Sequence, residues 1–298
     1  MQPSETNYYS SLFLASRPKT LLASVLPVVL GSHLAFTQSS SIDIVLLSSI
    51  ILSVLCIQVA TNFFNDSLDN LKGADNADRI GPKRMVSSGQ IPSQSLIIAG
   101  ITFVVMAITF SLPIVVARGL PIIFIGIISL ILSYCYTGGP WPLAYKGLGE
   151  LFVFLFFGLT SVAGSYFVFI GNIDLKSILL GAQSGLLCCV IIAINNARDV
   201  EGDRRCGKLT LAARFGLSFA RTQILCFSVL PYVIGFLWIP LGITRMALLP
   251  LIGLPFSILI SFLIFRTVPS KSYNKFLGLS VIAYTKFVLL IILSHHLS

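Results

Sequence analysis

The fold is decided by residues 43–69, DIVLLSSIILSVLCIQVATNFFNDSLD, in which a long apolar run ends abruptly in acids and amides. A second stretch, residues 176–203, KSILLGAQSGLLCCVIIAINNARDVEGD, follows the same plan. A helix needs roughly 20 predominantly apolar residues to cross the hydrocarbon core of a bilayer, and both runs are long enough. The two stretches therefore predict membrane-spanning helices that each deliver a cluster of carboxylates to one membrane face.

The composition also places the chain in a membrane. Hydrophobic residues make up 55% of the 298 residues, charged residues only 10%, and the mean hydropathy is +0.92. Soluble globular chains carry about 25% charged residues, so these values indicate an integral membrane protein of the all-α class. We predict one domain, residues 1–298, whose helices form a single bundle around a central cavity. About nine spans are expected, near residues 20–36, 43–65, 94–116, 119–136, 149–170, 176–197, 218–239, 245–265 and 276–294.

The positions of the charges explain the formal net charge of +9. With nine spans and a cytoplasmic N-terminus, one face collects most of the lysines and arginines, whereas the other receives Arg118, Lys176 and Arg245. Cytoplasmic loops are enriched in Lys and Arg, so the positive charge is a topology signal and indicates no nucleic-acid partner. We expect a multi-pass protein of the cytoplasmic (inner) membrane. Its acidic clusters would face the cytoplasm, and residues 1–19 would lead into an uncleaved first span.

The cysteines and histidines predict no metal site. None of the six cysteines forms a C-x-x-C pair, and most lie inside predicted spans, where thiols behave as small apolar residues. We expect no disulfide framework from them. His33, His295 and His296 fall near the opposite face without the spacing of metal ligands, so we expect ordinary side chains there.

The two acidic clusters have the pattern of a cation site. Residues three or four apart share a helix face. Two sets of side chains are therefore expected to project together: Asn62, Asp66 and Asp69, and Asn195, Asp199 and Asp203. Two carboxylates about 5 Å apart repel by roughly 3 kcal/mol at an effective dielectric constant near 20. Both sets also lie at helix C-termini, where the macrodipole disfavours anions, so they require a cation unless they are protonated. Oxygen ligands suit Mg²⁺ or Ca²⁺, and the lack of neighbouring His or Cys argues against zinc.

Basic residues beside the acids favour a diphosphate as the substrate. The adjoining loops carry Lys72, Arg79, Arg84, Arg198 and Lys208, which can grip oxyanions beside a carboxylate-bound metal. The apolar spans could accommodate a long lipid tail. The alternative is that the acids are solvated helix ends next to positive-inside loops. We favour a functional pair because the two clusters occupy corresponding places, four spans apart.

Five further positions are candidate substrate contacts. Tyr136 and Tyr145 flank a Gly-Gly-Pro-Trp-Pro turn, where they could contact a ring or a carbocation, or serve as interfacial belt residues. Glu150 lies just inside a span, where an unpaired carboxylate is costly, so we expect a functional or ion-paired role. Arg17 and Lys19 are candidate contacts for a carboxylate or phosphate, or else plain topology signals.

At these motifs the chain resembles the UbiA superfamily of intramembrane prenyltransferases, which carry two Asp-rich motifs of this kind. The resemblance runs from residue 16 to about residue 216, and it is greatest to the branch that prenylates 1,4-dihydroxy-2-naphthoate. The matching stretches are Ser16-Arg17-Pro18-Lys19-Thr20, Asn65-Asp66-x-x-Asp69, Gly73-Ala74-Asp75-x-x-Asp78-Arg79-x-Gly81-Pro82-x-Arg84, Tyr136-Thr137-Gly138-Gly139-Pro140, Tyr145-x-Gly147-Leu148-Gly149-Glu150 and Asn195-Asn196-x-Arg198-Asp199-x-x-x-Asp203-x-x-x-Gly207-Lys208. Gly73 stands where the wider superfamily often has a third Asp, and Asp75 is expected to substitute for it.

The resemblance implies a reaction and a role for each residue. The catalytic residues would be Asp66, Asp69, Asp199 and Asp203, which would bind Mg²⁺ together with Asp75. The metal would hold an all-trans polyprenyl diphosphate, whose departure leaves an allylic carbocation. The ring of 1,4-dihydroxy-2-naphthoate would attack it and lose its carboxylate, giving demethylmenaquinone in menaquinone synthesis. The implied substrate-binding residues are Asn62, Asn65, Lys72, Arg79, Arg84, Tyr136, Tyr145, Glu150, Asn195, Asn196, Arg198, Lys208, Arg17 and Lys19.

Two alternatives remain open. Another aromatic acceptor, 4-hydroxybenzoate or homogentisate, would call for the same kind of motifs. A membrane transporter could also carry paired motifs on an internal repeat. Transporters usually place their ionisable sites near the bilayer midplane, however, whereas these acids gather at one face.

Overall fold

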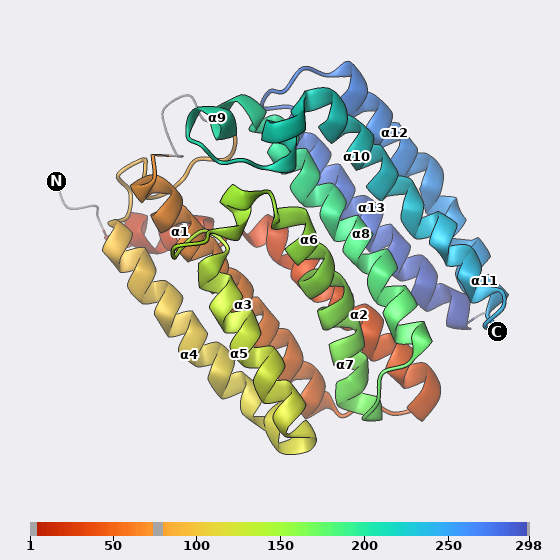
Figure 1. The fold of residues 1–298 in the computed structure, drawn as a ribbon. Coiled ribbons are helices and arrows are strands. Elements are labelled where there is room, and N and C mark those ends of the chain that lie inside the picture. The colour runs from red at the N-terminus through yellow and green to blue at the C-terminus, as the bar shows by residue number, and fades with distance from the viewer. Residues whose placement is uncertain (1–4, 74–79, 297–298) are drawn as a thin grey trace.

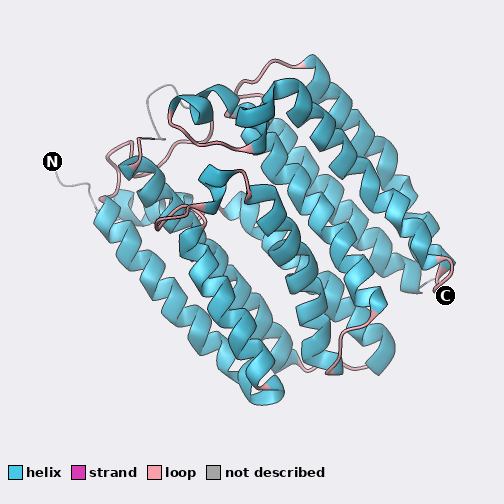
Figure 2. Cartoon of the chain, in the orientation of Figure 1, coloured by secondary structure: helices cyan, strands magenta, loops and turns pink. Residues whose placement is uncertain are grey.

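The computed structural model describes residues 5–73 and 80–296, and this part of the chain contains helices and loops but no strand (Figure 2). The predicted all-α fold is therefore confirmed. The α-helices are α1 (Glu5–Ala15), α2 (Pro18–Ser39), α3 (Ile44–Leu71), α4 (Ser93–Arg118), α5 (Leu120–Cys135), α6 (Gly149–Val153), α7 (Ser161–Ile170), α8 (Leu175–Arg198), α9 (Val200–Arg205), α10 (Leu211–Gly235), α11 (Thr244–Leu248), α12 (Leu254–Arg266) and α13 (Tyr273–His296). Short helical segments join them: η1 (Leu143–Lys146), the π-helix η2 (Phe154–Thr160), η3 (Phe236–Trp238) and η4 (Leu249–Gly253).

Eight of the described helical segments are long and apolar enough to cross a membrane. They are Thr20–Ser39, Ile44–Leu71, Ser93–Arg118, Gly149–Ile170, Leu175–Arg198, Leu211–Trp238, Thr244–Arg266 and Tyr273–His296. The remaining predicted span, near residues 119–136, corresponds to α5. Its 16 residues extend about 24 Å at 1.5 Å per residue, less than the hydrocarbon core of about 30 Å. The chain is thus a multi-pass membrane protein close to the expected nine spans.

Local sequence signals set where the two motif-bearing helices begin. The Asp43 carboxylate accepts the N–H groups of Val45 and Leu46 at the start of α3. At the start of α8, Asp174 and Ser177 form a reciprocal capping box. Such caps satisfy amide groups that have no partner inside the helix. Helix α3 runs six residues beyond its predicted end at residue 65, so its acids lie within the helix rather than after it.

A glycine-lined crossing brings the middle of the bundle together. A Cβ atom added to Gly158 would lie 2.5 Å from the Cα atom of Gly185, so α8 and η2 meet backbone to backbone. At this crossing the α-helical geometry changes to the π-helix η2, a feature that is frequent at functional sites. Each motif-bearing helix also packs closely with a later helix, α3 against α4 and α8 against α10 (Figure 1).

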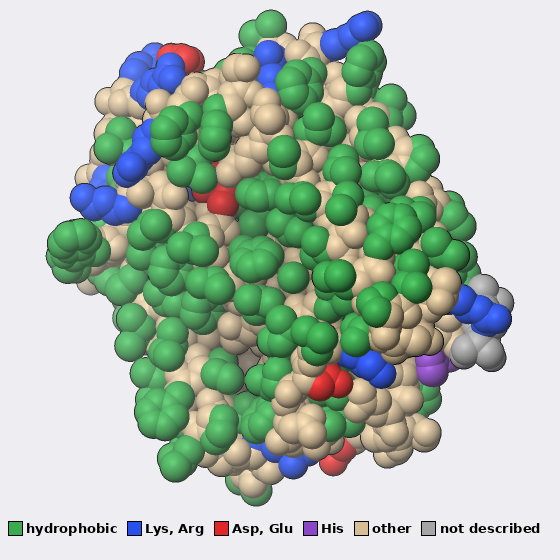
Figure 3. All heavy atoms as spheres, turned by 45° about the vertical axis from the view of Figure 1, so that its right-hand side comes forward, with side chains coloured by type: hydrophobic (Ala, Val, Ile, Leu, Met, Phe, Trp, Pro, Cys, Tyr) green, Lys and Arg blue, Asp and Glu red, His purple; other side chains and the backbone are tan. Residues whose placement is uncertain are grey.

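The helical bundle has polar side chains toward its two ends and apolar side chains across its middle. Figure 1 shows the C-terminal ends of α3 and α8 at the same end, together with α1 and α9. At the opposite end, Arg118 donates to the carbonyl oxygens of Val168 (2.8 Å) and Phe169 (3.0 Å), the last turn of α7. Figure 3 shows apolar side chains across the middle of one face and Lys and Arg toward its ends. This distribution is that of a bundle immersed in lipid.

Candidate active site at the ends of helices α3 and α8

The first acidic cluster is buried at the C-terminal end of α3. Asp66 and Asp69 are each 2% exposed. The two Asp66 oxygens accept the N–H groups of Met85 and Val86, both at 3.1 Å, so Asp66 fixes the turn that precedes α4. Asp69 accepts a hydrogen bond from the Tyr145 hydroxyl at 2.9 Å. Both carboxylates therefore lie inside the protein, each in contact with donors from other segments.

Asp69 also forms ion pairs with two cations. Its Oδ2 atom lies 3.1 Å from Nη2 of Arg84 and 3.7 Å from Nζ of Lys208. Arg84 follows the first motif, whereas Lys208 follows the second. The pair between Lys208 and Asp69 thus joins two motifs that are 139 positions apart in the chain.

The two amides of the first motif fix neighbouring segments. Asn62 donates to the carbonyl oxygen of Ser16 at 2.9 Å, at the junction between α1 and α2. The next residue, Arg17, has a left-handed backbone conformation with φ of 54°, which breaks the chain into two helices directly before Pro18. The Asn65 side chain accepts a hydrogen bond from the Thr137 hydroxyl, which lies in the turn after α5. Both amides lie beside the acids, and both bind parts of the protein.

The second cluster lies where α8 gives way to α9. Asp199 has φ of −96° and ψ of 9° and separates the two helices, so the predicted continuous face of Asn195, Asp199 and Asp203 is interrupted at its centre. Arg198 donates from Nε and Nη2 to the two oxygens of Asp199, at 2.8 and 2.6 Å. The same side chain donates to Asn195 at 2.6 Å. Asp203 is buried beside Thr210, whose hydroxyl lies 3.4 Å from its Oδ2 atom.

Arg198 is buried in an ion pair within the second motif. Its guanidinium pairs with Asp199, and its side chain is 0% exposed. Arg198 is the last residue of α8 and Asp199 is the residue that follows, so the pair lies at the end of that helix. Its expected contact with substrate oxyanions stays a prediction.

Tyr145 links the loops of the two motifs. The ammonium groups of Lys72 and Lys208 lie 4.6 and 5.4 Å from the centre of its ring, in the range of cation–π attraction. The N–H group of Leu209 donates to the Tyr145 carbonyl oxygen at 3.1 Å. Burial lowers the pKa of Lys72, an effect that Asp69 opposes and Lys208 reinforces. The cations predicted from the two loops therefore gather around one aromatic side chain.

Glu150 and Tyr136 extend the site into the bundle. Glu150 is 4% exposed, and its Oε1 atom accepts a hydrogen bond from Asn196 at 2.9 Å. A Cβ atom on Gly149 would lie 3.1 Å from the Tyr136 hydroxyl, so the glycine leaves room for that side chain. The Tyr136 hydroxyl thus lies close to the segment that carries Glu150.

A cavity of about 250 Å³ begins at Tyr136 and continues between the helices. Its lining includes Tyr136 near the motif end and Ile122 and Val168 farther along. Tyr136 and Ile122 are 14 residues apart on or next to α5, which is about 21 Å along a helix. The cavity is therefore elongated and runs along the bundle.

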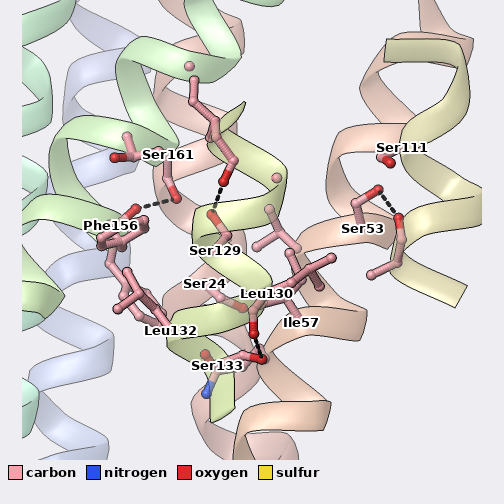
Figure 4. Close-up of a pocket in the computed structure, with 18 of the residues that line it drawn as sticks. Ser24, Ser53, Ile57, Ser111, Ser129, Leu130, Leu132, Ser133, Phe156 and Ser161 are labelled. Atoms are coloured by element: carbon pink, nitrogen blue, oxygen red, sulfur yellow. Dashed lines mark hydrogen bonds between the residues drawn. The ribbon is translucent and has the colours of Figure 1, made fainter. Parts of the chain in front are cut away.

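The wall of this cavity is apolar in spite of its serines (Figure 4). Figure 4 shows Ser53, Ser129, Ser133 and Ser161 with their hydroxyl groups bonded to main-chain carbonyl oxygens, at 3.3, 2.8, 2.7 and 2.8 Å. Because each of these hydroxyl groups already donates its hydrogen to a main-chain carbonyl, none of them has a hydrogen left to donate to a polar ligand. The cavity fits a hydrocarbon chain.

Some predicted site residues lie outside what the structure describes. Asp75 and Arg79, as well as Asp78 of the same loop, fall in residues 74–79, and the side chain of Lys19 is likewise outside the described part. Sequence reasoning missed Thr137, whose side chain and carbonyl oxygen bind Asn65 and Lys72. Its place in the turn next to Tyr136 was the available signal.

The donor set at this end fits a hard divalent cation. The acids and amides present only oxygen atoms, and such ligands suit Mg²⁺ rather than zinc. Among residues 5–73 and 80–296, however, no group of three or more acidic, His or Cys side chains converges as a metal site. Asp69 and Asp199 are each paired with cationic side chains of the protein itself.

The chain is similar to known membrane proteins. The sequence profile of the UbiA prenyltransferase family matches residues 24–286. A Haemophilus influenzae protein named 1,4-dihydroxy-2-naphthoate octaprenyltransferase is 35% identical over 209 residues, 67% of this chain and 68% of that protein. The Bacillus subtilis protein of the same name is 32% identical over 80% of this chain and 75% of its own length. A solved UbiA homolog from Archaeoglobus fulgidus, bound to DMAPP and Mg²⁺, aligns with a TM-score of 0.67 at 15% identity, covering 95% of this chain and 99% of that one.

Proposed function

This chain belongs to the UbiA prenyltransferase family, and from that premise we propose that it transfers a polyprenyl group from an all-trans polyprenyl diphosphate to 1,4-dihydroxy-2-naphthoate. The proposal for the acceptor rests on relatives that carry the name 1,4-dihydroxy-2-naphthoate octaprenyltransferase. The products would be diphosphate, carbon dioxide and demethylmenaquinol, the reduced form of demethylmenaquinone.

The observation that carries the proposal is the contact between the motifs, Lys208 Nζ to Asp69 Oδ2 at 3.7 Å. It brings acids from α3 and cations from the loop after α9 to one place, where a diphosphate needs both a metal site and basic donors. The neighbouring Tyr136 lines the apolar cavity, so a tail attached to that diphosphate has a path into the bundle.

Each part of the site has a task in the transfer. Lys72, Arg84 and Lys208 would bind the oxygens of the diphosphate and stabilise the charge that develops as the C–O bond breaks. When bound at the carboxylates of Asp66, Asp69, Asp199 and Asp203, Mg²⁺ would supply further neutralisation of that leaving group. In the first motif, Asp66 also accepts the N–H group of Met85, and Asp69 also pairs with Arg84.

In the next step, the electron-rich ring of the naphthoate supplies the electron pair for the new bond to the prenyl group. The C–O bond of the donor breaks first, and diphosphate leaves with its electron pair. A ring carbon of the naphthoate then forms the new C–C bond to the allylic carbocation, and the carboxylate leaves as carbon dioxide while its electron pair returns to the ring. Tyr136 lines the cavity, its hydroxyl lies close to Gly149, and Glu150 is the next residue, so these two side chains could orient the acceptor ring and its hydroxyl groups. The apolar cavity wall keeps water away from the carbocation.

We place this site on the cytoplasmic side of the membrane. Lys72, Arg84, Arg198 and Lys208 lie at the same end of the bundle as the acids, and such residues favour the cytoplasmic face. Cysteine substitution of exposed residues at either end, followed by labelling in intact cells, tests the orientation. Labelling of Lys83→Cys by an impermeant maleimide in intact cells would contradict it.

An acceptor panel tests the proposed activity. Purified protein is supplied with Mg²⁺, octaprenyl diphosphate and one acceptor: 1,4-dihydroxy-2-naphthoate, 4-hydroxybenzoate or homogentisate. We expect prenylated product with the naphthoate at a rate at least tenfold above either alternative. Product with 4-hydroxybenzoate or homogentisate alone would overturn the proposed acceptor while leaving the family intact.

A further inference from the structure

The carboxylates of the site already have positive partners supplied by the protein. Asp69 is 2% exposed, and its Oδ2 atom lies 3.1 Å from Arg84 and 3.7 Å from Lys208. Its other oxygen accepts the Tyr145 hydroxyl at 2.9 Å. In the second motif, both oxygens of Asp199 are held by the Arg198 guanidinium. Asp69 and Asp199 are therefore each paired with a cation of the protein before any ligand binds.

Carboxylates that are already paired with cations should have a low affinity for a metal ion that binds without a diphosphate. A divalent cation that binds Asp69 must displace Arg84 or Lys208, and Arg84 is only 6% exposed. Breaking the ion pair between a buried cation and a buried carboxylate costs free energy. A diphosphate offsets the cost of this displacement, because its oxygens can accept new charge-assisted hydrogen bonds from the displaced guanidinium and ammonium groups.

Lys208 has the contacts expected of a mobile partner. Its side chain is 18% exposed, and its distance of 3.7 Å from Asp69 exceeds the usual length of a charge-assisted hydrogen bond. It also lies 5.4 Å from the centre of the Tyr145 ring. The ring face can hold the ammonium group when it leaves the carboxylate.

We propose that Arg84 and Lys208 are exchangeable counter-cations of Asp69: they occupy the carboxylate until a diphosphate arrives with its metal, and then transfer to the diphosphate oxygens. The metal and the diphosphate consequently bind together, and the metal alone binds weakly. This inference rests on the proposed function for the identity of the ligand. It assigns Arg84 and Lys208 a positioning role that gates metal binding, in addition to their contacts with substrate.

Equilibrium dialysis of Mn²⁺ against the purified full-length protein in detergent tests the exchange. Protein-retained Mn²⁺ is counted with and without inorganic pyrophosphate, and electron paramagnetic resonance reports the protein-bound ion. We expect the apparent affinity for Mn²⁺ to be at least tenfold higher when pyrophosphate is present. Equal retention of Mn²⁺ with and without pyrophosphate would overturn the proposal.

Charge-removing variants supply the second arm. With Lys208→Gln and Arg84→Gln, Mn²⁺ without pyrophosphate should bind at least tenfold more tightly than to the wild type, and the gain from pyrophosphate should shrink. The matched control is Lys146→Gln, whose exposed ammonium lies over Trp141 instead, 5.4 Å from the ring centre, and it should behave as the wild type does. If Arg84→Gln does not fold, Lys208→Gln carries the test because its side chain is more exposed. Weaker or unchanged binding of Mn²⁺ alone by Lys208→Gln would refute the exchange.

The outcome is independent of the acceptor. Dialysis needs no naphthoate, so a protein that forms the expected product but binds Mn²⁺ without regard to pyrophosphate would refute only the exchange. A protein that shows the exchange but prenylates no naphthoate would refute only the proposed acceptor.

Discussion

A phenylalanine in place of Gly126 would test whether the apolar cavity holds the prenyl tail. Gly126 lines the cavity from α5, and no atom lies within 4 Å of a Cβ atom built there. The new side chain would therefore enter the cavity without a backbone clash. Gly126 is 10 residues from Tyr136, about 15 Å along a helix. A geranyl tail has seven C–C bonds of about 1.5 Å in its main chain and spans at most about 10 Å, so it ends before this position.

The expected effect depends on tail length. An octaprenyl tail would have to give up the burial of up to one five-carbon unit, and at about 0.8 kcal/mol per buried CH₂ this loss is at most about 4 kcal/mol. Because 1.4 kcal/mol is a factor of ten, kcat/KM for octaprenyl diphosphate should fall between tenfold and a thousandfold. For geranyl diphosphate it should change by less than about twofold relative to the wild type.

The assay is transfer to 1,4-dihydroxy-2-naphthoate with both donors, using protein whose thermal unfolding matches the wild type. Gly278→Phe is the matched control, because Gly278 also has open space at its Cβ position but lies on α13 outside the cavity lining. Equal losses with the two donors, or an unimpaired octaprenyl reaction, would show that the tail lies elsewhere.

Three further outcomes follow from the contacts. Asp69→Asn should abolish transfer and lower the free energy of unfolding by about 3–5 kcal/mol, because the buried ion pair between Asp69 and Arg84 is broken. Adding Arg84→Gln should restore stability without activity, and an active Asp69→Asn protein would contradict this. Glu150→Gln can keep the hydrogen bond from Asn196, so we expect turnover at least tenfold lower with an unchanged unfolding midpoint; normal turnover would exclude a role for the charge. Burial raises the pKa of Asp174, but hydrogen bonds from Ser177, Tyr166 and Gln38 outweigh it and the net pKa is lowered. Its stabilising contribution should therefore be lost as pH falls below about 4, and an Asp174→Asn protein that keeps the same acid-unfolding profile would refute this.

The sequence predicts the helical framework because membrane spans follow from local composition. Residues 43–69 read as a span that ends in acids, and α3 is that helix with two more polar turns than expected. The extension is a tertiary effect, since partners far along the chain, such as Met85 and Tyr145, hold the acids of those turns. The hydrophobic periodicity of the sequence does not identify such distant partners.

The pairing within the site was the part that sequence reasoning could not predict. Charge and spacing brought Asp69 and Lys208 into one candidate site, and the structure places them in contact. The same reasoning gave Arg198 a role toward a ligand, but it did not predict the ion pair of Arg198 with Asp199, which lies where α8 gives way to α9. A helix end is decided by packing and capping that reach beyond the local pattern, so the direction of a charged side chain there needs the fold.

The most direct test of the whole account is the mass of the product. Purified protein in a bilayer is incubated with octaprenyl diphosphate and 1,4-dihydroxy-2-naphthoate, once with Mg²⁺ and once with a chelator. We expect octaprenyl demethylmenaquinol and one equivalent of free diphosphate in the presence of Mg²⁺, and neither with the chelator. Prenylated product that forms equally well without a divalent metal, or diphosphate release with no prenylated naphthol, would contradict a site in which α3 and α8 share one metal-bound diphosphate.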